Sequence, residues 1–155
     1  MTGGQFIGQS NSYCIFVSNK VSGLTNFGGW CWFQVLSIRG HGPPNGNAAV
    51  HCEQGGFIAC NSGSRFNINY QGVIIAGAAT FMAEGCDFSS NGTFALYCYG
   101  TATAWVNNST MQANGSNSII ATNGAYVEGI GCSLAQPWTP AFNTYNTNNG
   151  GFISH

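Results

Sequence analysis

A segment of about 23 residues repeats along the second half of the chain. The stretch GCDFSSNGTFALYCYGTATAWVN (85–107) aligns with NSTMQANGSNSIIATNGAYVEGI (108–130), and GCSLA begins the next copy at Gly131. An earlier copy, RFNINYQGVIIAGA (65–78), matches DFSSNGTFALYCYG (87–100) at a spacing of 22 residues. A fixed period of this length is typical of stacked supersecondary units, each of which buries its apolar side against the next.

The alignment places apolar residues in columns and stacks the turn Asn91-Gly92 on Asn114-Gly115. Small and medium side chains dominate these columns, as a narrow core requires. The expected columns are Phe88 with Met111 and Leu134, Leu96 with Ile119, Cys98 with Ala121 and, at the 22-residue spacing, Phe66 under Phe88, Ile74 under Leu96 and Ala76 under Cys98.

Apolar residues alternate within each copy. In 103–107 we expect Ala104 and Val106 to face inward, and Thr103, Trp105 and Asn107 to face outward. Each copy holds about three such short strands, separated by Gly, Asn and Ser and without a helical stretch. The pattern predicts an all-β fold, a right-handed single-stranded parallel β-helix whose coils stack about 4.8 Å apart.

The chain is expected to be a single domain over residues 1–155. Residues 1–47 would form less regular first coils, 48–134 the regular coils, and 135–155 a C-terminal cap. The cap is expected because the repeat breaks after Leu134 into a segment with two prolines and Trp138. Such a cap would cover the open sheet edge, which otherwise invites aggregation.

Charged residues make up only 5% of the chain, and its three cations are Lys20, Arg39 and Arg65. This balance offers no positive field for phosphates, so nucleic acid and anionic membranes are poor partners. No apolar run reaches the length of a membrane span, and the first residues do not resemble a signal peptide, so we expect a soluble protein made in a cytoplasm.

The seven cysteines show no metal-ligand spacing with histidine, and we expect neither a metal nor a cofactor. Cys86 and Cys132 would share a column two coils apart, about 10 Å, which is too far for a disulfide. The cysteines are therefore interpreted as small buried thiols.

Coils of this length with Asn-Gly turns, the phrase ATNGAYVEGIGCSL (121–134) and the ending from Thr139 to Ile153 resemble the β-helix segments of bacteriophage tail fibres and tailspikes. The resemblance covers the chain from about Ala48 to its end. It implies a virion protein assembled in a host cytoplasm, a homotrimer joined to other virion proteins at its N-terminal end. It also implies binding to a host-surface polysaccharide or receptor. It transfers no catalytic residue.

The outward positions are the candidate contact residues. An exposed aromatic ladder could stack on sugar rings or pack against symmetry mates, and the apolar outward positions expected at Ile75, Ile120 and Ile130 favour subunit packing. The expected outward columns are Met82, Trp105 and Glu128; beside them Thr80, Thr103 and Tyr126; and, on another strand, Tyr97 and Tyr99, lying over Ile75 and Gly77 and under Ile120 and Thr122.

An enzymatic interpretation needs a pair of carboxylates, and the chain has only Glu53, Glu84, Asp87 and Glu128. Glu84 and Asp87 are the candidate pair, although they flank the bend at Gly85-Cys86. The alternative to a non-catalytic receptor-binding module is therefore a polysaccharide depolymerase, and a second alternative is a virion decoration protein. An enzyme should show two carboxylates in a cleft lined by aromatic residues, whereas a binding module needs the aromatic residues alone.

Histidines and glycosylation sequons carry less information. His41, His51 and His155 are scattered and predict no catalytic or metal geometry. The Asn-x-Ser/Thr triplets, of which those at Asn91 and Asn114 repeat, are interpreted as turn residues rather than glycan sites.

Overall fold

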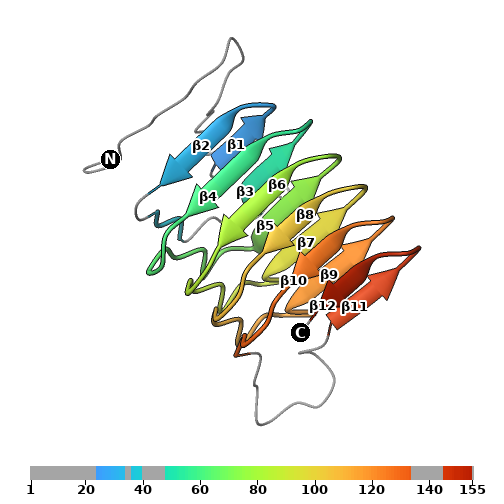
Figure 1. Cartoon of the computed structure of the whole chain (residues 1–155). Helices are drawn as coiled ribbons and strands as arrows, with labels where there is room; N and C mark the ends of the chain where they lie inside the picture. Colours follow the sequence, from blue (N-terminus) through green and yellow to red (C-terminus); the bar gives the residue numbers. More distant parts are fainter. Residues whose placement is uncertain (1–23, 34–35, 40–47, 134–144, 155) are drawn as a thin grey trace.

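The computed structural model describes residues 24–33, 36–39, 48–133 and 145–154 as a β-solenoid of about five turns. Its strands are all parallel, and each rung contributes one strand to each of two six-stranded sheets (Figure 1). The first sheet contains β1 (Leu24–Phe27), β3 (Ala48–Glu53), β5 (Gln71–Ala76), β7 (Leu96–Tyr99), β9 (Ile119–Thr122) and β11 (Tyr145–Asn148). The second sheet contains β2 (Trp30–Phe33), β4 (Phe57–Cys60), β6 (Thr80–Ala83), β8 (Thr103–Trp105), β10 (Tyr126–Glu128) and β12 (Phe152–Ser154).

The third side of each rung is a ladder of single-residue bridges rather than a strand. The bridges run in parallel from Ser37 through Arg65, Asp87 and Thr110 to Ser133. The sequence predicted about three short strands in each coil, and the structure has two strands and one bridged position. Gly, Asn and Ser on this side favour turns over extended backbone, so each rung has one bridged residue and no strand. Single backbone hydrogen bonds, such as those from Ile68 N–H to Ser89 O and from Ser90 N–H to Gln112 O, still join the rungs beyond that residue.

The register confirms the 23-residue period and corrects two of the expected inward neighbours. Arg65 pairs with Asp87 at the expected spacing of 22, which places Phe66 beside Phe88. In the next strands, however, Val73 pairs with Leu96, a spacing of 23. One additional residue in the turn before β7 causes the change.

This slip of one residue exchanges the two faces of β5. Ile74 does not lie under Leu96, and Ala76 does not lie under Cys98. Instead Ile75 pairs with Cys98 and is fully buried, so its predicted outward position is wrong. Tyr97 and Tyr99 instead pair with Ile74 and with Ala76, which is buried, whereas Ile120 and Thr122 lie on their other side as predicted.

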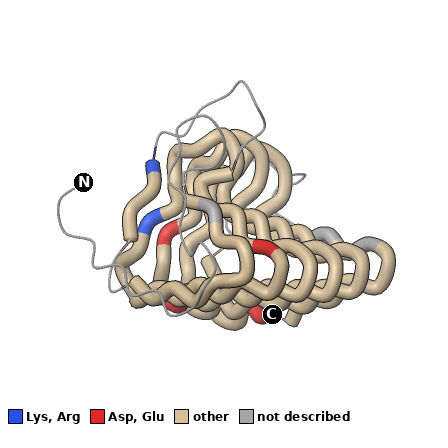
Figure 2. The backbone as a smooth tube through the Cα atoms, turned by 90° about the horizontal axis from the view of Figure 1, so that it is seen from above, with Lys and Arg blue, Asp and Glu red and all other residues tan. Residues whose placement is uncertain are grey.

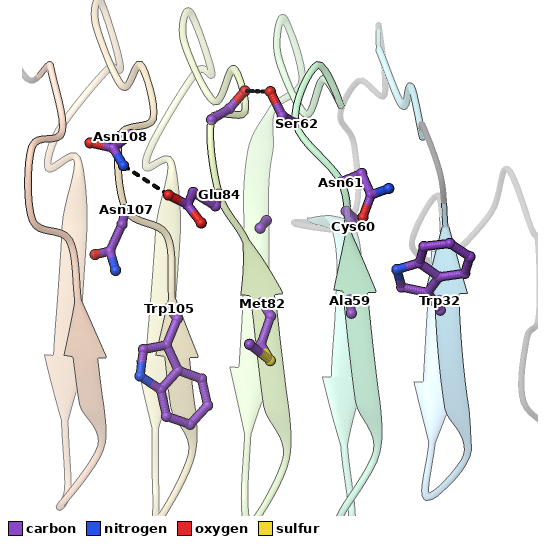
Figure 3. Close-up of a pocket in the computed structure, with 12 residues that line it drawn as sticks. Trp32, Ala59, Cys60, Asn61, Ser62, Met82, Glu84, Trp105, Asn107 and Asn108 are labelled. Carbon is purple, nitrogen blue, oxygen red and sulfur yellow. Dashed lines mark hydrogen bonds between the residues drawn. The ribbon is translucent and has the colours of Figure 1, made fainter.

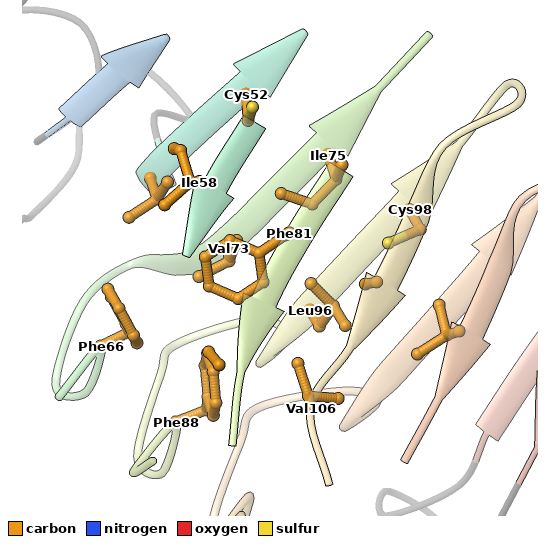
Figure 4. Packing of buried hydrophobic residues seen from close by; sticks show 14 of the residues in the cluster. Cys52, Ile58, Phe66, Val73, Ile75, Phe81, Phe88, Leu96, Cys98 and Val106 are labelled. Atoms are coloured by element: carbon orange, nitrogen blue, oxygen red, sulfur yellow. The ribbon is translucent and has the colours of Figure 1, made fainter. Parts of the chain in front are cut away.

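Inward columns fill the interior between the sheets (Figure 4). Phe66 stacks on Phe88 with ring centroids 5.1 Å apart, and Phe81 meets Phe88 edge-on at 6.2 Å. Met111 continues the column of Phe88 and is fully buried, as predicted. Burial of these large side chains supplies the main driving force for stacking the rungs.

The cysteines of the described residues are thiols, as predicted. Five of them are buried and Cys132 is partly buried. Burial raises the pKa of the Cys86 thiol to about 11, since a thiolate would lose its hydration, although hydrogen bonds from Ser64 oppose this effect. These side chains act as small apolar fillers of the core.

A ladder of buried asparagines fixes one corner of the coil. The Oδ1 atoms of Asn91 and Asn114 accept hydrogen bonds from the backbone N–H of the asparagine one rung before, Asn69 and Asn91 respectively, each at 3.0 Å. Asn91 Nδ2 also donates to the carbonyls of Phe66 and Phe88, at 3.0 and 2.8 Å. Because both Asn91 and Asn114 are buried, the structure supports their interpretation as turn residues.

Glycines allow neighbouring rungs to approach closely at two further points. A Cβ atom on Gly72 would lie 2.0 Å from the carbonyl oxygen of Ala95, and one on Gly115 would lie 1.9 Å from that of Gly92. A side chain at either position would push the rungs apart, so glycine is required there for packing rather than for turning.

The terminal rungs are longer than the central ones. Leu24 pairs with Val50 at a spacing of 26 residues, and Tyr126 pairs with Phe152 at the same spacing. Part of the segment predicted as a cap is therefore a further rung, formed by β11 and β12. The prolines and Trp138 lie outside the described residues.

Candidate functional site

The outer face of the second sheet carries two neighbouring columns of side chains. In the first, aromatic rings occupy both ends and threonines the middle. Trp30 stacks on Phe57 at 4.6 Å and 17°, and Tyr126 stacks on Phe152 at 5.7 Å and 7°. From the N-terminal rung onward this column is Trp30, Phe57, Thr80, Thr103, Tyr126 and Phe152.

The second column places two tryptophans on either side of smaller or flexible residues. It runs through Trp32, Ala59, Met82, Trp105, Glu128 and Ser154. The order Met82, Trp105, Glu128 is confirmed, and so is the neighbouring order Thr80, Thr103, Tyr126. Alternation in β8, with Ala104 buried between Thr103 and Trp105, sets the outward direction of Trp105.

A groove of about 650 Å³ lies between Trp32 and Trp105, and we call it the tryptophan groove. Ala59 and Met82 lie between the two indoles, and polar side chains follow along the ends of the strands (Figure 3). The volume falls in the range of small-molecule sites. The polar side chains of the lining are Asn61, Ser62, Glu84, Asn107 and Asn108.

Hydrogen bonds fix the polar rim. Asn108 Nδ2 donates to Glu84 Oε1 at 2.9 Å, and Ser62 Oγ donates to the carbonyl of Gly85 at 3.4 Å. Asn108 adopts a left-handed backbone conformation, with φ of 55°, which asparagine tolerates better than most residues. The corner therefore presents its amide and carboxylate groups in defined positions.

The structure places the two predicted catalytic candidates in separate recesses. Glu84 lines the tryptophan groove, whereas Asp87 lines a second recess of about 540 Å³ with Arg65 and Asn67. Asp87 accepts hydrogen bonds from the Ser89 backbone N–H, at 3.0 Å, and from Asn67 Nδ2. The Asp87 carboxylate thus stabilises the turn in which it lies.

Glu128 lies beside Trp105 on the next rung and is also held by its neighbours. Its Oε1 accepts a hydrogen bond from Asn107 Nδ2 at 2.6 Å, and its Oε2 accepts one from the Tyr126 hydroxyl at 3.3 Å. Among the described residues that line the tryptophan groove, Glu84 is the only carboxylate and none carries positive charge. Figure 2 shows how sparse the charged positions are along the coil.

Tyr97 and Tyr99, also predicted as contact residues, lie on the outer face of the first sheet. Their ring centroids are 5.2 Å apart, and the Phe94 ring meets Tyr97 at 5.6 Å. Burial, followed by the neighbouring Glu53 and Tyr97, raises the pKa of the Tyr99 hydroxyl. The predicted contact residues therefore belong to two separate faces.

His51 lies on this same face of the first sheet, partly exposed between the buried Val50 and Cys52. Its Nε2 lies 3.4 Å from Glu53 Oε2, and its ring centroid is 6.3 Å from that of Phe27. Burial lowers the pKa of His51 more than Glu53 raises it, so the neutral imidazole is favoured at neutral pH.

The N-terminal half of the aromatic face was not predicted from the repeat. Trp30 and Trp32 lie in β2, where their exposed side chains alternate with the buried Cys31 and Phe33. This WCWF alternation was a usable signal. The spacing of 27 residues between Trp30 and Phe57 hid its alignment with the regular repeat.

Comparisons with protein-family models, with curated proteins and with solved structures find no match. In the described ranges, no three His, Cys, Asp or Glu residues form a cluster that could hold a metal ion. Nor does the described part of the chain contain a helix that is long and apolar enough to cross a bilayer.

Proposed function

We propose that this chain is a non-catalytic structural and receptor-binding module of a bacteriophage tail fibre or tailspike, wound as a right-handed β-helix and assembled as a homotrimer in the virion. The observation that carries the proposal is the aromatic outer face of the second sheet, which holds a groove with a single carboxylate. Recognition of a receptor needs such a face, whereas hydrolysis of a polysaccharide would need a second carboxylate beside Glu84.

The exposed aromatic area supports a contact role. Trp30 is 59% exposed, Trp32 46% and Phe152 58%, and Met82 between them is 42% exposed. Large apolar side chains gathered on one face of a soluble fold mark an interaction surface. Tryptophan is also the residue type most enriched at the centres of binding interfaces.

The first sheet offers a different surface for subunit packing. Ile74, Tyr97 and Ile120 are paired neighbours on successive rungs, and each is partly exposed. A row of partly exposed apolar and aromatic side chains suits a symmetric interface between copies. In the proposed trimer, the first sheet faces the other subunits and the second sheet faces the receptor, while other virion proteins join at the N-terminal end.

Two measurements test the proposal on the whole chain. Light scattering should give three times the chain mass, and labelled protein should adsorb to cells of some members of a bacterial panel. Trp105→Ala and Tyr126→Ala should reduce adsorption without changing the mass. A monomer that adsorbs to no cells would contradict the proposal, and release of sugar fragments from a surface polysaccharide would contradict its non-catalytic part.

A further inference from the structure

The tryptophan groove has a defined length along the solenoid. Trp32 and Trp105 belong to rungs that are three intervals apart, so their Cα atoms are separated by about 14 Å at the spacing of parallel strands. Ala59 and Met82 occupy the two rungs between them. The small side chain of Ala59 leaves a depression beside Trp32, so the floor lies lower than the two ends.

An occupant would meet two kinds of surface. The indoles of Trp32 and Trp105 offer apolar faces, which suit the C–H faces of sugar rings. The rim offers amides and a carboxylate, from Asn61, Asn107 and Glu84, which suit hydroxyl groups because they can donate or accept hydrogen bonds at many angles. An apolar protein segment would offer no hydrogen-bond partner to the exposed Asn61 amide or to Glu84 Oε2.

Charge restricts the occupant further. The lining holds the negative Glu84 and no described cation, and Glu128 adds a second negative charge beside Trp105. The two described arginines, Arg39 and Arg65, do not belong to the groove lining. An acidic sugar chain would therefore be repelled here without compensation.

We infer that the tryptophan groove holds an uncharged stretch of a sugar chain, which lies along the solenoid axis from Trp32 to Trp105, and that Glu84 excludes acidic sugars. The inference rests on the proposed receptor-binding function and names the class of ligand. The two indoles hold the ends of the stretch. The rim of Asn61, Glu84 and Asn107 forms hydrogen bonds with the hydroxyl groups of the sugar chain.

Binding measurements with defined oligosaccharides test the inference. The probes are neutral hexasaccharides of glucose, mannose and galactose, set against oligogalacturonate and oligosialic acid. The unmodified chain should bind at least one neutral probe and neither acidic probe. Trp32→Ala and Trp105→Ala should each weaken that binding by about 10-fold or more, because each removes one end of the groove.

Tyr70→Ala is the control, since Tyr70 is an exposed aromatic residue that lies outside the groove lining and outside the strands of both sheets. It should leave the affinity within about twofold. Glu84→Gln should keep the neutral probe bound, because its amide oxygen still accepts from Asn108, and should admit an acidic probe. Glu128→Gln should admit acidic probes less than Glu84→Gln does.

Several outcomes would overturn the inference. These are binding of no neutral probe, preference for an acidic probe, or equal losses with Tyr70→Ala and Trp105→Ala. A change of solution mass with Trp105→Ala would assign the groove to contact between copies instead. If Trp105→Ala and Tyr126→Ala reduce bacterial adsorption but no neutral probe binds, the inference fails and the proposed receptor-binding function stands.

Discussion

The inner and outer sides of the second sheet follow different rules. On the inner side, one column passes through Ile58, Phe81 and Ala104, which differ in size but are all apolar and fully buried. One residue further along each strand, the outer column passes through Ala59, Met82 and Trp105 and then reaches a glutamate. The repeat thus restricts the inner side to apolar residues and leaves the outer side free to vary in chemistry, so specificity can change there without loss of the fold.

The largest expected effect comes from the neighbouring residues Phe81 and Met82. Phe81→Ala removes a fully buried ring that packs on Phe66 and Phe88, and should lower the free energy of unfolding by about 3–5 kcal/mol. Met82→Ala, on the exposed side of the same strand, should change it by about 0.5 kcal/mol. Urea unfolding measures both values, and equal losses of unfolding free energy would contradict the difference between the inner and outer sides of the second sheet.

Contact between rungs can be tested with two glycines. Gly72→Ala forces a methyl group against the Ala95 carbonyl and should cost about 3 kcal/mol. Gly55→Ala adds its methyl where no atom lies within 4 Å, so only the positive φ of 77° opposes it, and the loss should be about 1 kcal/mol. Thermal unfolding of both variants measures the difference, and a greater loss at Gly55 would contradict the close approach at Gly72.

Loss of the asparagine ladder should lower the free energy of unfolding by nearly as much. Asn91→Ala leaves the backbone N–H of Asn69 and the carbonyls of Phe66 and Phe88 without these side-chain partners, and should cost about 2 kcal/mol. Asn61→Ala, at an exposed position, should cost about 0.5 kcal/mol or less. Denaturant midpoints at constant slope would give both values, and a stable Asn91→Ala protein would argue against the ladder's role.

One substitution at an exposed position should increase stability. Ile68 is 51% exposed and has φ of 59°, a conformation that strains a β-branched residue. Ile68→Asn should therefore stabilise the fold by about 1 kcal/mol, since asparagine tolerates this region. Ile130 is equally exposed but is not in a positive-φ conformation, so Ile130→Asn should bring no comparable gain in the same thermal assay.

The smallest effect concerns His51. Because burial lowers its pKa in the folded state, the unfolded chain binds more protons below about pH 6.5. Stability contributed by the neutral imidazole is present above that pH and is lost as the pH falls toward the folded pKa. Melting curves between about pH 7 and 5.5 should show a shallow decline that His51→Gln reduces. An unchanged slope in the variant would assign the decline to other groups.

The inward columns were predictable because apolar side chains mark them. Phe88 with Met111 and Leu96 with Ile119 align by spacing alone, and the structure confirms both. The error at Ile74 arose in the turn before β7, which contains one additional residue. Because the additional residue replaces no apolar marker, the apolar pattern does not show the insertion. Turn residues hold the chain by backbone hydrogen bonds, which the identities of side chains record only weakly.

The candidate site was predictable only in its C-terminal half. Trp105, Met82 and Tyr126 lie in rungs of constant length, so their outward direction followed from the period. Trp32 completes the groove from a rung 27 residues away from its neighbour, and its partnership with Trp105 depends on three successive strand pairings. Alternation in a single strand gives the direction of a side chain, but it does not give the neighbour across the sheet.

Because the solenoid is built from rungs, the length of the tryptophan groove is a whole number of rung spacings. Deleting one complete 23-residue rung between Ala59 and Trp105 would bring the Cα atoms of the two tryptophans from about 14 Å to about 10 Å apart, and adding one would take them to about 19 Å. Neither change alters the groups at the two ends. A change in the number of rungs in a solenoid of this kind therefore changes the length of the ligand that fits the groove. The residues that contact the two ends of that ligand stay the same.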